Sequence, residues 1–418
     1  MRKRVLIINY AGLKYGGIEK FISDLMSYSI EENYRVIWLT TQECLENADY
    51  KVAQNNALEK VVVCKNKRRL HQFKKIELNI KTEEHVTMIS FDPISYISVD
   101  YLRNRSKKGM FDHFYIIPHF TGNIYFLNRY FKNKYIAKIV NKYMANIVNK
   151  MMANNSLLAF GEKHFKEYEK AYQVKLKDYK NLIVKNIQIE KELSDIELLE
   201  KAKRRKKYFE IVTCARFDFP HKGYIVGMIN DFKYIKQFIP YATLTIAGYG
   251  DGIEKINKTI QALPEDCQKS INLPGALNTD ELEAMYRRAT LNIGVAGALS
   301  TGARCGVVSF PVRHYSYNCE TYGYYEKVSN MTLSSSPGEN IIDYVKDVYN
   351  MSNEEYVKHC MDAIVAGKRL VEVDPEYLFN IHNTYEYSKI SFKEKVMALL
   401  INYISIFKYL LKKDSVTD

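Results

Sequence analysis

Short apolar runs that each end in a polar or glycine-containing segment recur along the whole chain. In the first half they span residues 5–8, 34–39, 60–64, 86–90 and 114–117. Continuous apolar runs of this length are typical of parallel strands that are buried on both faces, and their alternation with helical sequence is typical of a doubly wound α/β sheet. The 418 residues are enough for two such domains, each with its own core.

One loop in the second half delivers two positive charges directly after such a run. The apolar run Glu210–Arg216 leads into Phe217–Gly223, which contains Lys222, and helical sequence follows. Because the carboxyl ends of parallel strands form the ligand crevice of an α/β sheet, Arg216 and Lys222 are placed to bind an anion.

The next apolar run ends in a loop rich in glycine. Residues 242–247 lead into Gly248-Tyr249-Gly250, with a further glycine at position 252. Glycines without a side chain let the backbone approach a ligand closely, and backbone N–H groups bind phosphate. The two loops together predict a bound diphosphate.

The order of these loops resembles the nucleotide-sugar half of retaining glycosyltransferases of the two-Rossmann-domain (GT-B) type, family 4. Leu277 lies where similar enzymes cradle the base through backbone contacts. The resemblance implies two Rossmann-like doubly wound α/β domains that face a central cleft, and a C-terminal helix that crosses back to the first domain. It also implies that Arg216 and Lys222 are catalytic, since they stabilise the leaving nucleoside diphosphate. No metal ion or other cofactor is then needed, and no Asp-x-Asp motif lies between apolar strands.

We expect four segments along the chain. Residues 1–190 form an acceptor-side domain and residues 191–207 a charged linker. Residues 208–385 form the nucleotide-sugar domain, and residues 386–418 form the crossover helix and tail.

Two features of the first domain match the same family. Gly16-Gly17 follows the first apolar run and resembles the turn that lies beneath the phosphates and sugar of the donor. His119 follows the run 114–117, where similar enzymes carry a histidine that faces the donor sugar, and its neutral imidazole could donate to a hydroxyl. The alternative for both is structural, because a glycine pair before a helix or a single histidine often serves packing alone.

The chain departs from the family at one motif. Similar enzymes usually carry two glutamates eight positions apart, which bind the donor sugar and the ribose. Here Thr301 takes the place of the second, and no acidic residue lies near the first. The hydroxyl of Ser300 or Thr301 could bind a ribose or phosphate oxygen, and Glu320 is the nearest carboxylate that could compensate, unless it caps a local loop. The chain either recognises its donor differently or has lost activity.

The cysteines and the amino terminus indicate a cytoplasmic protein. Seven cysteines show no Cys-x-x-Cys pair, and their odd, scattered arrangement argues against a disulfide framework or a cysteine zinc site. The apolar run 5–8 is too short for a signal peptide.

The positive charge is concentrated in the first half. Residues 1–190 contain 32 Lys and Arg against 19 Asp and Glu, whereas residues 191–418 contain 29 of each, so the net charge of +13 lies in the first half. A basic surface can attract anionic lipid or an acidic acceptor, although a solvated surface is the plainer alternative. The basic runs lack the interleaved aromatic residues of an RNA-binding surface, and we expect no nucleic-acid partner.

Two segments could contact a membrane. Residues 128–152 are expected to form a helix with Lys134, Lys138 and Lys142 opposite an apolar face. Residues 392–411 are nearly apolar but fall short of the ~20 residues that span a bilayer. The alternatives are a solvated lysine stripe and burial against the first domain.

From these features the sequence predicts a metal-independent, retaining glycosyltransferase. It would move a sugar from a nucleoside-diphosphate sugar onto a cell-surface glycan precursor, such as one for capsule or lipopolysaccharide. The acceptor would be lipid-linked, with the protein peripheral at the inner membrane face. A non-catalytic transferase-fold subunit that binds a glycan or a partner enzyme is the alternative, and a sugar-nucleotide epimerase is a third. The sugar, the base and the acceptor stay open.

Overall fold

A computed structural model of the chain describes two compact units. Unit 1 comprises residues 1–187 with 372–418, and unit 2 comprises residues 188–371. The residues described are 3–13, 16–65, 70–91, 97–98, 102, 110–117, 134–172, 174–175, 182–187, 193–328, 334–369, 371–372, 375–383, 391–394, 396 and 399–400.

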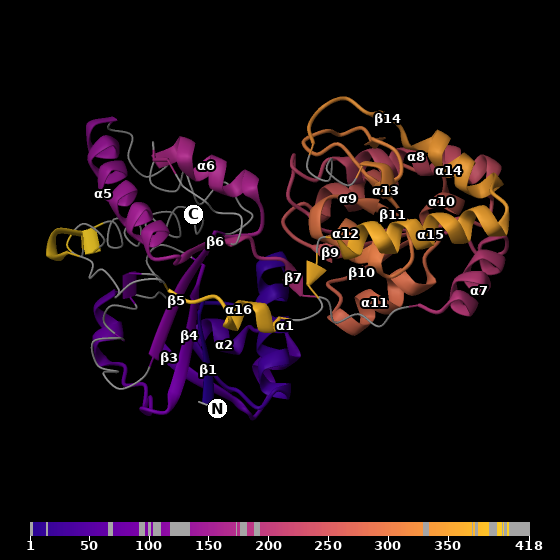
Figure 1. Cartoon of the computed structure of the whole chain (residues 1–418). Coiled ribbons are helices and arrows are strands. Elements are labelled where there is room, and N and C mark those ends of the chain that lie inside the picture. The colour runs from indigo at the N-terminus through magenta and orange to yellow at the C-terminus, as the bar shows by residue number, and fades with distance from the viewer. Residues whose placement is uncertain are drawn as a thin grey trace. The chain divides into compact units, whose positions relative to one another are not determined.

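Unit 1 contains a six-stranded parallel sheet with the strand order β3-β2-β1-β4-β5-β6 (Figure 1). The strands are β1 (Lys3–Asn9), β2 (Arg35–Thr41), β3 (Leu58–Cys64), β4 (Glu84–Ser90), β5 (Met110–Ile117) and β6 (Leu157–Ala159). The five apolar runs of the first half therefore form strands as expected. The chain order reverses between β1 and β4, so the loops after these two strands diverge at the carboxyl edge of the sheet.

Both faces of the unit 1 sheet are covered. Successive residues of β1 alternate between two cores, with Leu6 and Ile8 packed beside Trp38 and with Val5 and Ile7 on the other face. The remaining elements of unit 1 are α1 (Gly17–Glu31), α2 (Gln42–Glu46), η1 (Lys51–Gln54), η2 (Leu70–Lys75), α5 (Lys134–Ala153), α6 (Glu162–Tyr172), β7 (Asn186–Ile187) and α16 (Glu376–Phe379), and β7 pairs with β15 (Val371–Glu372).

Unit 2 contains a five-stranded parallel sheet with the order β10-β9-β8-β11-β12. The strands are β8 (Glu210–Arg216), β9 (Thr243–Tyr249), β10 (Ile271–Gly275), β11 (Leu291–Gly294) and β12 (Val308–Pro311). The other elements of unit 2 are α7 (Asp195–Arg205), α8 (Tyr224–Phe238), α9 (Ile253–Gln261), α10 (Glu265–Lys269), α11 (Thr279–Arg288), α12 (Ala296–Arg304), β13 (Glu320–Thr321), α13 (Tyr325–Val328), β14 (Glu339–Asn340), α14 (Ile341–Asn350) and α15 (Asn353–Lys368).

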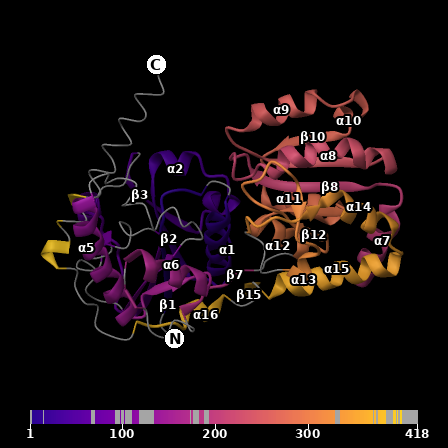
Figure 2. The same ribbon diagram turned by 90° about the horizontal axis from the view of Figure 1, so that it is seen from above.

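Helices cover both faces of the unit 2 sheet as well. Ile211 of β8 packs with residues of α8, whereas Val212 packs with Met285 and Tyr286 of α11. Figure 2 shows α8 and α12 on opposite sides of β8. Each unit is thus a doubly wound α/β layer structure, which confirms the predicted fold class.

The segment expected as a charged linker contains a helix, α7. Its amino terminus is a capping box, in which Ser194 and Glu197 satisfy each other's backbone N–H groups. Arg205 in its last turn is buried and donates to the carbonyl oxygens of Val348 and Met351. This helix belongs to unit 2.

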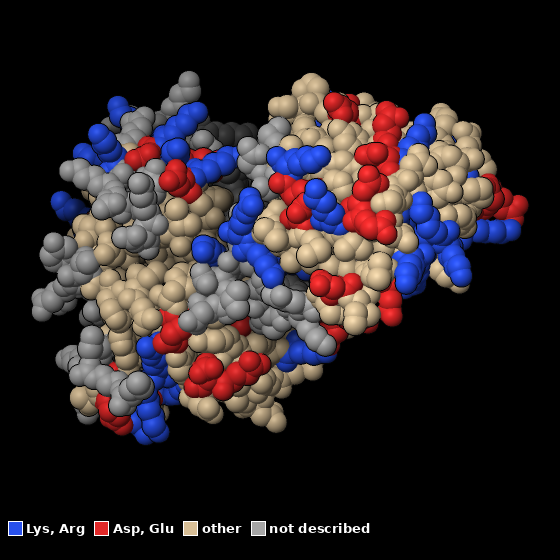
Figure 3. All heavy atoms as spheres, turned by 45° about the vertical axis from the view of Figure 1, so that its right-hand side comes forward, with Lys and Arg blue, Asp and Glu red and all other residues tan. Residues whose placement is uncertain are grey.

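The expected lysine-bearing helix of unit 1 is present as α5 from Lys134 onward, and residues 128–133 lie outside the described residues. Lys134 is its first residue, the side chains of Lys138 and Lys142 are exposed, and Ile147 and Val148 are buried in the core of unit 1. On the face of the molecule drawn in Figure 3, the Lys and Arg of the described residues lie among Asp and Glu. None of the helices in the described residues is both long enough and apolar enough to cross a membrane. Most of the apolar tail, including residues 401–411, lies outside the described residues.

Candidate functional site

The two loops that the sequence singles out in unit 2 lie side by side. β8 and β9 are parallel neighbours, with Arg216 opposite Tyr249 in the register. The guanidinium carbon of Arg216 lies 5.7 Å from the centre of the Tyr249 ring. The backbone N–H of Phe217 donates to the Tyr249 carbonyl at 2.7 Å, and the Phe217 carbonyl accepts from Gly252 at 3.0 Å. The exposed Arg216 and the glycine loop therefore share one edge of the sheet.

The structure gives Gly248 and Gly250 a packing role. Both have φ near +142°, a conformation that residues with a side chain rarely adopt. A Cβ at Gly248 would lie 1.8 Å from the Ala215 carbonyl oxygen, and one at Gly250 would lie 2.9 Å from backbone atoms of Phe217. The glycines allow the second loop to close against the first. Contact with a ligand at this loop stays a prediction.

Lys222 is the second cation of this edge, and its side chain is only partly exposed. Its backbone N–H donates to the Asp218 carbonyl at 2.8 Å, which folds the loop back just before α8 begins. Burial lowers the pKa of the Lys222 ammonium from 10.5 to about 8, although Asp218 and Cys214 act in the opposite direction. Within the part of the chain that the structure describes, this side chain has no ion-pair partner. Strongly perturbed pKa values cluster at functional sites, so Lys222 is a candidate site residue.

The position of this lysine coincides with the point where the chain order of the sheet reverses. β8 lies between β9 and β11, and the connections after β8 and β11 leave in opposite directions. In open α/β sheets the ligand crevice lies at this reversal point, beyond the carboxyl ends of the strands.

The connection after β11 adds a helix amino terminus to the same edge. α12 begins at Ala296, whose φ is +53°, and its first turn has neither an acidic residue nor a side-chain cap. The N–H groups of that turn lack intrahelical acceptors, and they favour an anion. Two cations at the end of β8 and a helix amino terminus after the neighbouring strand β11 thus lie at one edge of the sheet.

A cluster of histidine and tyrosine rings lies next to Lys222, and the sequence alone does not predict it. The ring of His221 lies 4.8 Å from that of Tyr315 and 5.6 Å from that of His314, which follows β12. Burial, followed by the electrostatic influence of Lys222 and of His314, lowers the pKa of His221 to about 4. His221 is therefore neutral at physiological pH and can donate or accept a hydrogen bond. Its position immediately before Lys222 was the only local signal that could have found it.

The hydroxyl and carboxyl groups expected to replace the missing glutamates have partners of their own. The Ser300 hydroxyl donates to the Gly297 carbonyl at 3.0 Å, and the Thr301 hydroxyl accepts from Arg304 at 3.3 Å. Because both contacts lie within α12, they hold the two hydroxyl groups against their own helix. A role for either hydroxyl in donor binding stays a prediction.

Glu320 lies in a local network. It accepts from Arg313 at 2.9 Å and from the backbone N–H of Gly338 at 3.4 Å. Burial alone would raise its pKa, but these contacts hold the pKa of Glu320 below its usual value. The contacts agree with the alternative of a loop cap, and a role in donor binding stays a prediction.

Leu277, the residue expected beneath the base, follows the end of β10. It is half-buried and packs on the cluster around Val212 and Tyr286. It therefore lies at the same carboxyl edge of the sheet, two strands away from β8.

The corresponding edge of unit 1 carries the glycine pair. Gly16 is the amino-terminal cap of α1, and Gly17 is its first residue. The Gly16 carbonyl accepts from the Tyr50 hydroxyl at 3.2 Å, and a Cβ at Gly16 would lie 2.3 Å from a carboxylate oxygen of Glu19. This turn follows β1, at the reversal point of the unit 1 sheet. His119 lies outside the described residues.

Solved structures that are similar over most of the chain include glycosyltransferases. HepE from Anabaena, solved with UDP and glucose, matches with a TM-score of 0.52 at 12% identity, over 88% of this chain and 95% of that one. A glycosyltransferase from Rickettsia africae matches with a TM-score of 0.50 at 14% identity, over 98% and 99% of the two chains. The fold is that of the GT-B glycosyltransferases.

One similar structure is not described as a glycosyltransferase. The amino-terminal domain of a trehalose-6-phosphate phosphatase from Candida albicans matches with a TM-score of 0.53 at 10% identity, over 89% of this chain and 94% of that one. No protein-family model and no curated protein matches the sequence. At such low identity the comparisons establish the fold, and the activity has to be argued from the site.

Proposed function

We propose that this chain is a glycosyltransferase that binds a nucleoside-diphosphate sugar at the edge of unit 2 where β8 and β11 end. The observation that carries the proposal is Lys222, a half-buried cation without an ion-pair partner in the described residues, in the loop that follows the exposed Arg216. A diphosphate would supply the missing counter-charge. The amino terminus of α12 on the neighbouring strand adds N–H donors.

The same groups account for the chemistry of transfer. When the bond between sugar and diphosphate breaks, negative charge builds on the leaving phosphate, and fixed cations stabilise it. Arg216 and Lys222 would do this without a metal ion, and Lys222 gains most because its ammonium is poorly solvated before the ligand binds. Retention of configuration at the sugar follows from the family resemblance alone.

For the acceptor we propose an anionic, lipid-linked precursor of a cell-surface glycan. The excess of Lys and Arg in residues 1–190 and the exposed Lys138 and Lys142 of α5 support an anionic partner for unit 1. Such a partner would hold the protein at the inner membrane face while the donor enters from the cytoplasm.

A non-catalytic binding subunit is the second candidate. It is favoured by the first turn of α12, which has no acidic residue, and by the internal bonds of Ser300 and Thr301. A subunit of this kind would keep the diphosphate site and lack turnover.

A panel of nucleotide sugars decides between the two. Calorimetry with UDP, ADP and GDP measures binding, and release of free nucleoside diphosphate measures turnover. We expect Arg216→Ala to weaken binding by about 1.5–3 kcal/mol, the range for a hydrogen bond to a charged group. The control is Arg288→Ala, since Arg288 pairs with Glu210 at 3.0 Å, at the start of β8 and away from the loop edge.

Each result has a definite meaning. Nucleotide binding that depends on Arg216, together with turnover, supports the transferase. The same binding without turnover of any donor supports the binding subunit. If no nucleotide binds, or if both variants lose affinity equally, the proposed site is wrong.

A further inference from the structure

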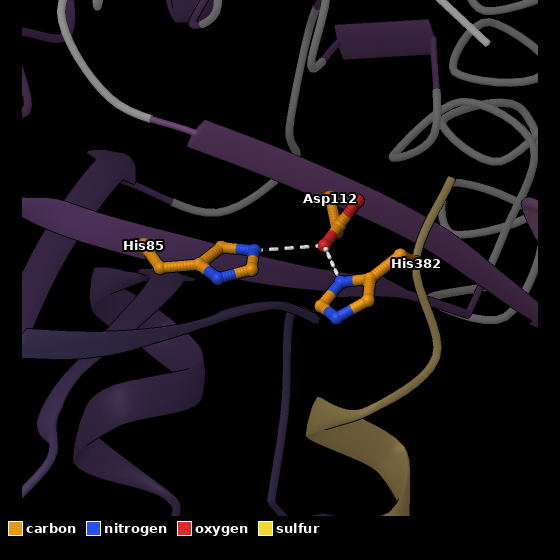
Figure 4. A group of neighbouring side chains, drawn as sticks. All are labelled: His85, Asp112 and His382. Atoms are coloured by element: carbon orange, nitrogen blue, oxygen red, sulfur yellow. Dashed lines mark hydrogen bonds and ion pairs between the residues drawn. The ribbon is translucent and has the colours of Figure 1, made fainter. Parts of the chain in front are cut away.

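Three side chains from separate segments of unit 1 converge on one point, away from the glycine turn. His85 lies on β4, Asp112 on the neighbouring strand β5, and His382 in the segment that follows α16 (Figure 4). His85 Nε2 and His382 Nδ1 each lie 2.8 Å from the same oxygen, Asp112 Oδ2. Among the described residues this is the one group of three histidine, cysteine or acidic side chains with the spacing of metal ligands.

The arrangement is held in place by the surrounding structure. The two imidazole rings stack with their centres 5.3 Å apart and an angle of 19° between their planes. The other carboxylate oxygen, Asp112 Oδ1, accepts from the backbone N–H of Asn383 at 2.9 Å. A hydrogen bond of this kind orients a ligating carboxylate and leaves its second oxygen for a metal.

We propose that His85, Asp112 and His382 bind a divalent transition-metal ion, with Zn²⁺ as the best fit. Two imidazole nitrogens and one carboxylate oxygen form a common ligand set for Zn²⁺, whereas Mg²⁺ and Ca²⁺ prefer oxygen alone. Bond lengths of about 2.0–2.2 Å set the ligand atoms of a tetrahedral ion roughly 3.3 Å apart. The three atoms already lie within 4.8 Å of one another, so small side-chain rotations suffice.

The exposure of the three residues fits an entry path from solvent. The side chains of His85 and Asp112 are 16% and 10% exposed, whereas that of His382 is 54% exposed. The ion would therefore bind from the His382 side and keep solvent at its remaining coordination position. Three protein ligands and an open position are compatible with Zn²⁺.

The ion would fasten residues 375–383 to the sheet of unit 1. This segment already contacts the remainder of unit 1 through Glu376, which pairs with Arg4, and through Tyr377, whose hydroxyl accepts from the backbone N–H of Lys185 at 2.9 Å. His382 lies at the far end of the described segment, where a metal would add the strongest attachment. The site is separate from the unit 2 edge, so this inference does not depend on the proposed transferase activity.

The test uses the full chain without a polyhistidine tag, stripped with a chelator and then dialysed against Zn²⁺, Co²⁺ or Mg²⁺. We expect one Zn²⁺ per chain, intense visible absorption with Co²⁺, and no binding of Mg²⁺. His382→Ala should weaken Zn²⁺ binding by at least about tenfold, since loss of a mere outer partner already costs that much. The matched control is His359→Ala, because His359 makes a similar 2.7 Å contact with Glu326 but has no third ligand in the described residues.

Asp112→Asn provides a second variant, and His382→Ala decides the matter if that variant fails to fold. Zn²⁺ should raise the melting temperature of the wild type and of His359→Ala, but not that of His382→Ala. The assignment would be overturned if the wild type does not bind Zn²⁺, or if His382→Ala binds Zn²⁺ as tightly as the wild type. The three side chains would then form a hydrogen-bonded cluster only.

Discussion

Replacing Lys222 with methionine should make unit 2 more stable at pH 7. Methionine keeps the length of the side chain and removes a partly buried charge. Burial lowers the pKa of Lys222 from 10.5 to about 8, and a change of one in a pKa corresponds to about 1.36 kcal/mol. Complete burial would thus cost about 3 kcal/mol, and because the side chain is partly exposed we expect a gain of about 1–2 kcal/mol.

The gain should disappear at high pH. Below pH 8 the lysine is protonated in the folded and unfolded chain alike, and the cost of its burial is constant. Between pH 8 and 10.5 the unfolded chain binds more protons than the folded one, so the stability of the wild type rises with pH. Above 10.5 both states are neutral at this position. The difference between the variant and the wild type should therefore shrink across this window.

Scanning calorimetry at several pH values measures the effect, because two units are not expected to unfold in one step. The single tryptophan, Trp38, is buried in unit 1, so its fluorescence identifies the transition of that unit and leaves the other to unit 2. The control is Lys255→Met, since Lys255 on α9 is exposed and lies 3.9 Å from the ring centre of Tyr317.

The affinity for the donor should fall in Lys222→Met, although the stability of unit 2 rises. Loss of the ammonium should weaken the affinity for a nucleotide sugar by about 1.5–3 kcal/mol, while Lys255→Met leaves it unchanged. A variant that is less stable than the wild type at pH 7 and binds the donor equally well would refute the reasoning, because Lys222 would then be a structural residue.

Three further outcomes follow from the structure. Gly248→Ala should destabilise unit 2 by more than about 2 kcal/mol in calorimetry, because its Cβ would meet the Ala215 carbonyl at 1.8 Å, whereas Gly297→Ala, with nothing within 4 Å, should not. Turnover should persist in excess chelator, because Arg216 and Lys222 stabilise the leaving diphosphate. If chelator abolishes turnover and Mg²⁺ or Mn²⁺ restores it, that role of the two side chains is contradicted. Changing Lys138 and Lys142 to Glu should reduce sedimentation with anionic liposomes at low salt and leave nucleotide binding intact, and a wild type that ignores such liposomes would argue for a soluble acceptor.

Local sequence predicts much of the fold because buried parallel strands are continuous apolar runs. Residues 5–8 and 86–90 lie within β1 and β4 for this reason. The structure of the charged segment before β8 is harder to predict. Arginine is usually a surface residue, yet Arg205 is buried against carbonyl groups of residues distant in sequence. Ser194 and Glu197, with the spacing of a capping box, were the local indication of α7.

The contacts that are remote in sequence could not be predicted in this way. Asp112 lies 27 residues from His85 and 270 from His382, and no local pattern links them. Pairing of this kind depends on the strand order and on the path of the chain after α16. Local motifs therefore predict a site at the unit 2 edge, whereas no motif indicates the histidine cluster of unit 1.

The arrangement at the unit 2 edge bears on what the missing glutamates would have done. A carboxylate in α12 would accept from hydroxyls of the donor, but Ser300 and Thr301 are bonded inside their own helix. Among the described residues, Arg216, Lys222 and backbone N–H groups at this edge favour phosphate, and the neutral His221 lies next to Lys222 in the chain. Most of the binding free energy would then come from the diphosphate, which every nucleoside-diphosphate sugar shares. Selection among sugars would have to come from elsewhere in the chain, and this is why affinity for the nucleotide and turnover of the donor need to be measured separately.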